Sequence, residues 1–103
     1  MAQKTVNSAI QACLDCIAAC ETCLGDCIGK AQMAECARLC LDCSQACQGC
    51  AGAMARGSQF RTQWSNLCAD ICNACAAECT KFSEKTCQDC AEACRRCANE
   101  CRA

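Results

Sequence analysis

Residues 13–27 read CLDCIAACETCLGDC, with cysteine at positions 13, 16, 20, 23 and 27. The steps between these cysteines alternate between three and four residues. That alternation is typical of the inward seam of a coiled-coil helix, with cysteine in the place that Leu or Ile would normally take. The segment therefore predicts one helix that carries a stripe of thiols along one face.

The same alternation recurs three more times along the chain. Chance would not maintain it through four blocks, so we expect each block to be one face of an α-helix. The 19 cysteines fall into the blocks Cys13, Cys16, Cys20, Cys23, Cys27; Cys36, Cys40, Cys43, Cys47, Cys50; Cys68, Cys72, Cys75, Cys79; and Cys87, Cys90, Cys94, Cys97, Cys101.

Turn-forming residues separate the blocks. Gly29 is placed to end a helix in the left-handed conformation, and Ser58, after Gly57, is expected to be an N-cap. Ser83 is expected to cap the last helix, with Glu84 near its positive end. These signals predict helices at about 5–28, 31–55, 58–82 and 84–101.

The predicted connections are only a few residues long, so consecutive helices must run antiparallel as neighbours. The chain is rich in helix-forming residues and contains no proline. The predicted fold class is all-α, an antiparallel up-down-up-down four-helix bundle with a cysteine-lined core. At 103 residues the chain suits a single domain, 1–103.

Charge and hydropathy argue against several classes of partner. A net charge of −1 gives no electrostatic reason to expect nucleic acid or an anionic membrane surface. The chain contains no run of about 18 apolar residues, so no membrane-spanning helix is expected. The first residues are not followed by the apolar segment of a secretion signal. We therefore expect a cytoplasmic protein.

Plain packing does not explain so many inward thiols, because a core with Cys in place of Leu at every layer is underfilled. Disulfides are disfavoured within a helix, where Cβ atoms at these spacings lie about 5–6 Å apart rather than the required ~3.5–4.5 Å. Zinc and iron–sulfur sites use discrete ligand sets, often from loops. With no histidine present, a catalytic metal is not expected, nor is enzymatic activity.

Copper(I) fits the pattern best, because it is soft and prefers thiolate ligands. The CxxxC pairs offer two-sulfur clamps on a single helix, which facing helices then link into clusters. One Cu(I) per thiolate leaves the core neutral, which predicts a capacity of roughly 15–20 ions per chain. General zinc or cadmium sequestration is the alternative, and an iron–sulfur redox protein is a more distant one.

The repeated CxxxC/CxxC ladder resembles the bacterial copper storage proteins, a family of cysteine-rich four-helix bundles, and the resemblance covers all four blocks, roughly residues 5 to 101. The resemblance implies Cu(I) held in the core, a homotetramer, and similarity to the cytosolic branch of the family. A copper chaperone or a chelator is the expected exchange partner. The chain departs from the family in having no His at the open end of the bundle.

Extrapolation of the cysteine register places two methionines, Met33 and Met54, on the inner face at opposite ends of the bundle. Each is a candidate copper ligand or an end plug. The end near Met54 is poor in cysteine, and its expected core positions are Val6, Met54, Arg61 and Ser65. We expect copper to be admitted there, because the Met33 end has cysteines close to both turns.

Two further apolar stripes run beside the cysteines. They could seal the seams between neighbouring helices, or they could bury against another chain and produce a homo-oligomer, which is the outcome that we predict. The stripes comprise Ile10, Leu14, Ile17, Leu24, Ile28 in the first helix and Phe60, Trp64, Leu67, Ile71 in the third.

Overall fold

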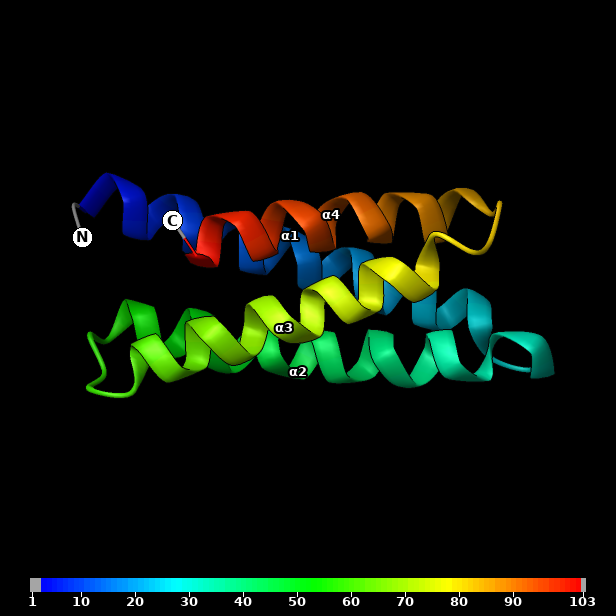
Figure 1. Ribbon diagram of the computed structural model, residues 1–103, viewed down its shortest axis with the longest axis horizontal. Helices are drawn as coiled ribbons and strands as arrows, with labels where there is room; N and C mark the ends of the chain where they lie inside the picture. The colour runs from blue at the N-terminus through cyan, green and yellow to red at the C-terminus, as the bar shows by residue number, and fades with distance from the viewer. Residues whose placement is uncertain (1–2, 103) are drawn as a thin grey trace.

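The computed structural model describes residues 3–102, and the side chains from Val6 onward. Four α-helices and one short 3-10 helix follow one another in this part of the chain (Figure 1). They are α1 (Gln3–Cys27), η1 (Ala31–Met33), α2 (Ala34–Ala55), α3 (Arg61–Cys79) and α4 (Lys85–Arg102).

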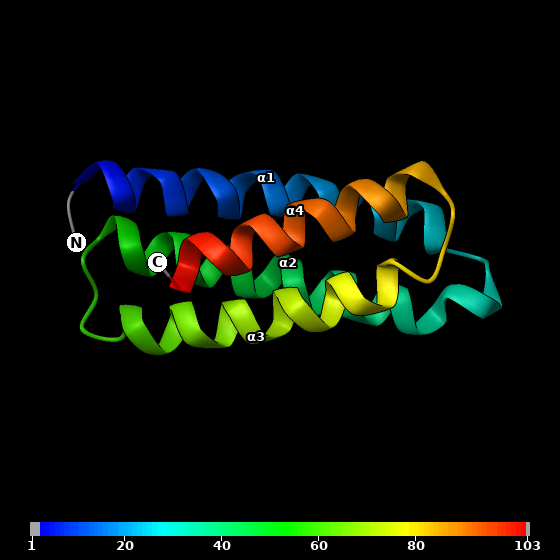
Figure 2. The same cartoon turned by 45° about the horizontal axis from the view of Figure 1, so that its top comes forward.

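Each helix packs antiparallel to its predecessor, and α4 closes the bundle against α1 (Figure 2). The pairs α1/α3 and α2/α4 lie on the diagonals. The molecule measures 41 × 18 × 17 Å, so it is a rod about as long as its longest helix. The predicted four-helix bundle is confirmed. None of the described helices is long and apolar enough to cross a bilayer.

Glycines end α1 and α2, and both have the left-handed backbone that glycine adopts without strain. Gly29 has φ +83°, as its position predicted, and Gly57 has φ +66°. After α2 the Ser58 amide donates to the Ala53 carbonyl at 2.9 Å and the Gly57 amide to the Met54 carbonyl at 3.3 Å. This pair of bonds is a Schellman motif, which satisfies two carbonyls at the helix end.

The third helix is shorter than the predicted range 58–82, and Ser58 is not its N-cap. Phe60 occupies that position, and the Ser58 hydroxyl instead accepts the Phe60 amide at 3.0 Å. Because residues 58–60 form this local turn, the regular helix begins only at Arg61. The residues after Cys79 form turns rather than a further helical turn.

The prediction that Ser83 caps the last helix is also wrong. α4 begins at Lys85, and the Glu84 carbonyl accepts the first helical amides, from Cys87 at 3.1 Å and Gln88 at 3.0 Å. The Gln88 side-chain amide donates back to the Phe82 carbonyl, which holds the preceding turn in place. Glu84 is therefore the N-cap, and its carboxylate lies near the positive end of α4.

The predicted apolar stripes divide into two groups. Their half-buried members, which pack on the core, are Ile10, Ile17, Leu24, Trp64 and Ile71. Their exposed members are Leu14, Ile28, Phe60 and Leu67, which are 48%, 73%, 54% and 50% exposed. The stripes thus seal helix seams in part and leave apolar side chains facing outward.

The contact between α2 and α3 depends on one glycine. The Trp64 ring lies so close to Gly49 that a Cβ atom added there would meet the ring carbons at 2.2–2.8 Å. No real Cβ is tolerated at such distances, so the ring or the helix would have to move. Gly25 in α1, in contrast, has no such neighbour within 4 Å.

We therefore expect Gly49→Ala to destabilise the reduced, metal-free protein by about 1–3 kcal/mol through overpacking. The matched control Gly25→Ala removes a helical glycine without a clash and should stabilise it by up to about 1 kcal/mol. Urea unfolding followed by circular dichroism measures both. Equal effects of the two substitutions would contradict the close α2–α3 contact.

Candidate metal centre

All 19 cysteine side chains point into the bundle, and none is more than 6% exposed. Alternation of three- and four-residue steps keeps each stripe on the inward face over the whole length of its helix. Small neighbours such as Ala69 and Ala91, both fully buried, let the helices pack closely around the sulfurs. The interior of the bundle is therefore a column of thiols.

Eighteen of these thiols form one continuous network. Neighbouring Sγ atoms are 3.5–4.0 Å apart, and the contacts run from Cys101 at one end to Cys87 at the other. Cys27, buried beside the network, is the remaining thiol. We call the whole set of 19 the thiol column.

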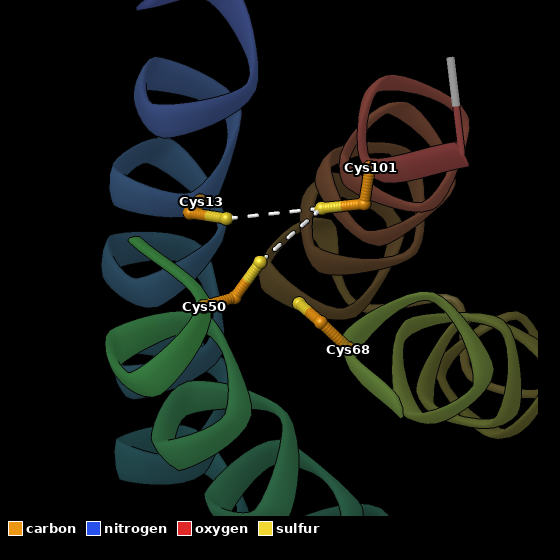
Figure 3. A group of neighbouring side chains, drawn as sticks. All are labelled: Cys13, Cys50, Cys68 and Cys101. Carbon is orange, nitrogen blue, oxygen red and sulfur yellow. Dashed lines mark hydrogen bonds between the residues drawn. The ribbon is translucent and has the colours of Figure 1, made fainter. Parts of the chain in front are cut away.

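Sulfurs from all four helices meet in layers across the column. Figure 3 shows Cys13, Cys50, Cys68 and Cys101, one from each helix, pointing toward one another. The Cys101 sulfur lies 3.9 Å from that of Cys13 and 3.8 Å from that of Cys50. All four sulfurs are within 4.8 Å of one another, so this layer could hold a metal ion.

The layers overlap rather than forming separate sites. Cys13 and Cys68 also belong to a second group of four, with Cys47 and Cys97. A sulfur shared by two groups must bridge two ions if both groups are filled. The column therefore suits a chain of bridged clusters better than a set of isolated tetrahedra.

The CxxxC pairs account for only part of the close spacing between cysteine sulfurs. In five of the eight pairs the sulfurs are 3.9 or 4.0 Å apart, whereas most of the short contacts join different helices. These five pairs are Cys16/Cys20, Cys68/Cys72, Cys75/Cys79, Cys90/Cys94 and Cys97/Cys101. Facing helices therefore contribute more of the close sulfur contacts than the clamps on one helix do.

The sulfur spacing matches metal coordination and not disulfide bonding. Every cysteine is free, and the shortest sulfur–sulfur separation, 3.5 Å, far exceeds a disulfide bond. With a metal–sulfur bond of about 2.3 Å, three sulfurs around one ion lie about 4.0 Å apart and four lie about 3.8 Å apart. An ion could thus enter the column with little movement of its ligands.

Burial favours the protonated form of the thiols near the Met33 end of the column. Desolvation raises the pKa of Cys23 and Cys87 and, with hydrogen bonding to Cys36, raises the pKa of Cys27 to about 11. Deeper in the column a thiolate is stabilised only by neighbouring thiols, as where hydrogen bonds from Cys20 and Cys43 lower the pKa of Cys16. A filled column must therefore exchange protons for cations.

The two predicted methionines lie at opposite ends. Met33 is fully buried at the end where the α1–α2 and α3–α4 connections lie. At that end the Thr86 hydroxyl donates to the Asp26 carboxylate at 2.6 Å, an exposed hydrogen bond that joins α4 to α1. Met54, next to the last residue of α2, is 8% exposed and lies at the other end, with the first turns of α1 and the end of α4.

A cleft of about 1050 Å³ opens at the Met54 end. Cys101, the most exposed of the thiols at 6%, lies in its lining. The end positions named from the sequence all line this cleft, although Arg61 is exposed there rather than in the core. The described lining residues are Val6, Met54, Ala55, Arg56, Gly57, Arg61, Thr62, Ser65, Asn66, Cys101 and Arg102.

Sequence reasoning missed two basic residues of this cleft, Arg56 and Arg102. The helical register gives no signal for them, because Arg56 follows the last residue of α2 and Arg102 ends α4. It also missed the contact between the Ser65 hydroxyl and the Cys50 sulfur, 3.8 Å apart. Ser65 is one helical step before Cys68, so a hydroxyl terminates the stripe of α3 at the cleft.

Comparison with known proteins agrees with this geometry. The copper storage protein family matches residues 2–103. The uncharacterized cysteine-rich protein YhjQ of Bacillus subtilis is 39% identical over 100 residues, which cover 94% of this chain and 93% of that protein.

Two solved structures share the fold. The Cu(I)-bound copper storage protein BsCsp3 of Bacillus subtilis has a TM-score of 0.90 and 39% identity, with 95% of each chain covered. A cytosolic copper storage protein from Streptomyces lividans, with five coppers, has a TM-score of 0.92 and 30% identity over 96% of this chain and 90% of its own. The chain belongs to the copper storage protein family.

Proposed function

We propose that the protein stores many Cu(I) ions, bound by the thiolates of the column. The observation that carries this proposal is the continuity of the sulfur network along the bundle. Relatives support it: BsCsp3 is Cu(I)-bound, and the Streptomyces lividans protein has been loaded with 10 copper equivalents. Storage requires no catalytic group, and the column contains only thiols.

Charge balance favours a high loading. Each Cu(I) that replaces a thiol proton leaves the core neutral, whereas unmatched buried thiolates are costly. Overlapping groups of four sulfurs allow the shared thiolates, such as those of Cys13 and Cys68, to bridge two ions. We propose that all 19 cysteines act as ligands and that Cu(I) also fills the space that small side chains leave.

The methionines are assigned different roles. Met54, close to Cys101 at the open cleft, is proposed as a relay ligand through which Cu(I) reaches the column. Met33, fully buried at the closed end, is proposed to plug the column and to serve as a thioether ligand for the last ion there.

We further propose that the protein works in the cytosol, as its Streptomyces lividans relative does. In this setting a reducing environment keeps the thiols free and copper monovalent. Copper would arrive from and leave to a chaperone or a chelator. The whole chain, residues 1–103, is proposed to act as one domain.

A broader role in zinc or cadmium sequestration is the second candidate. It is favoured by the layers in which four sulfurs lie within 4.8 Å, a geometry that a tetrahedral ion accepts. Because neighbouring layers share sulfurs, however, separate tetrahedral ions could fill only some of them at one time.

An anaerobic titration of the reduced protein tests these alternatives. We expect saturation at roughly 15–20 Cu(I) per chain, with about one proton released per ion. A strong Cu(I) chelator in competition and metal analysis after gel filtration give the count. Saturation at four or five ions would contradict the proposal and favour discrete tetrahedral sites.

We also propose that the protein is a homo-oligomer, a tetramer by family resemblance, assembled through the exposed apolar side chains. Light scattering should give a mass above that of one chain. Leu67→Gln, which places an amide at a 50% exposed leucine, should weaken association. The control Asn73→Gln changes an exposed polar residue of the same helix. A monomeric wild-type protein at high concentration would disprove the assembly.

A further inference from the structure

The cleft at the Met54 end carries a concentration of positive charge. Arg56, Arg61 and Arg102 all line it, and none of its described lining residues is acidic. Arg102 pairs with Asp70, but Arg56 and Arg61 form no ion pair with any described residue. The chain as a whole has a net charge of −1, so the positive charge is local to this end.

Most cations near the Met33 end are paired, whereas Lys30 there forms no ion pair with a described residue. Lys81 pairs with Glu78 at 2.8 Å and Lys85 with Asp89 at 2.7 Å. Within each of these i,i+3 and i,i+4 pairs the two opposite charges neutralise each other on the helix surface, so the pairs add little net electric field. The two ends of the bundle thus differ in charge as well as in openness.

The arginines lie in the same cleft as the most exposed thiol of the column. Cys101 is 6% exposed, and its sulfur contacts those of Cys13, Cys50 and Cys97 at 3.8–4.0 Å. A ligand drawn into the cleft by its charge would therefore meet a thiol that is already connected to the rest of the column.

The chemistry of monovalent copper specifies what such a cleft can receive. Cu(I) held by two thiolates is anionic, because one positive charge faces two negative ones, and carboxylates on the thiols add to the negative charge. Guanidinium groups bind carboxylates through paired, charge-assisted hydrogen bonds. A concave site of about 1050 Å³ has the size of a small-molecule pocket rather than of a protein interface.

We infer that this cleft docks small anionic Cu(I)–thiolate complexes and passes their copper to Cys101. The inference rests on the proposed storage function and names the form in which copper is delivered. Arg56 and Arg61 attract and hold the complex. Arg102 lines the same cleft, but its charge is paired with that of Asp70.

The transfer is a ligand exchange without any change of oxidation state. The Cys101 sulfur forms a bond to Cu(I) as one carrier thiolate leaves, and the Cys101 proton goes to that departing thiolate, which becomes a neutral thiol. A Cys13 or Cys50 sulfur that has already lost its proton to an earlier ion then bridges to the new ion and displaces the second carrier thiolate, so each ion removes one proton from the column. Each proton lost by the column is thus carried away by a carrier thiol.

Rates of copper uptake from different carriers test the inference. Stopped-flow measurements would compare Cu(I) complexed by glutathione, which is strongly anionic, with Cu(I) complexed by cysteamine, which is cationic. The double variant Arg56→Gln/Arg61→Gln should slow uptake from the glutathione complex about tenfold at low salt. Uptake from the cysteamine complex should be unchanged or faster, and raising the salt should remove the difference.

The control Arg38→Gln/Arg95→Gln changes the net charge by the same amount away from the cleft, and it should leave both rates unchanged. An equal slowing with both carriers, no slowing at all, or the same loss in the control would overturn the inference. Equilibrium capacity for Cu(I), measured in parallel, should be the same in every variant. A wild-type protein that bound only a few Cu(I) ions at equilibrium would instead refute the storage function.

A second pair of variants locates the point of admission independently of charge. Met54→Ala should slow uptake from both carriers, because the relay ligand at the cleft is lost. Met33→Ala should leave the initial rate of uptake unchanged, since Met33 lies at the closed end and is proposed to bind only the last ion. The reverse result would place copper admission at the Met33 end and would overturn the role of the arginine cleft.

Discussion

A column of close sulfur–sulfur contacts along the bundle axis determines most other features of this protein. Cysteine is smaller than the Leu or Ile that usually fills a four-helix bundle, and a thiol buries less apolar surface. The four helices must therefore pack closely, which requires small neighbours such as Ala69 and Ala91 and a glycine under Trp64. The interior must also remain neutral, as a column of thiols or as thiolates matched by cations.

The two ends of the rod complete this arrangement in opposite ways. At one end Met33 is fully buried and the Thr86–Asp26 hydrogen bond joins two helices. At the other, the thiol stripes of α2 and α3 give way to Met54 and Ser65, and a cleft exposes the edge of Cys101. A store needs many equivalent ligands inside and a restricted route to them. The thiol column provides the ligands, and one open end opposite one closed end provides the route.

Much of the fold could be read from the sequence because the cysteine spacing reports directly on helix periodicity. The number of helices, their order, the inward stripe and the left-handed Gly29 all follow from spacing and turn chemistry. The ends of α3 and the cap of α4 did not follow, because Ser58 and Ser83 lie in turns whose local hydrogen bonds compete with helix capping.

The candidate site was predictable to a similar extent. Register alone places all the thiols and both methionines inside, but it cannot show that layers of sulfurs from four helices overlap. Nor can it show the basic cleft, because Arg56, Arg61 and Arg102 come from a turn and two helix ends that only the folded bundle brings together. Arg61 was expected in the core by register, yet a guanidinium is too costly to bury unpaired and stays in the open cleft.

Anomalous diffraction at the copper absorption edge, from crystals of the Cu(I)-loaded protein, would test the central claim most directly. A store built on the thiol column should give a row of copper peaks along the bundle axis, each bonded to sulfurs from facing helices, from the layer of Cys101 to that of Cys87. Copper confined to a few separate sites, or bound on the outer surface while the column stayed empty, would contradict it.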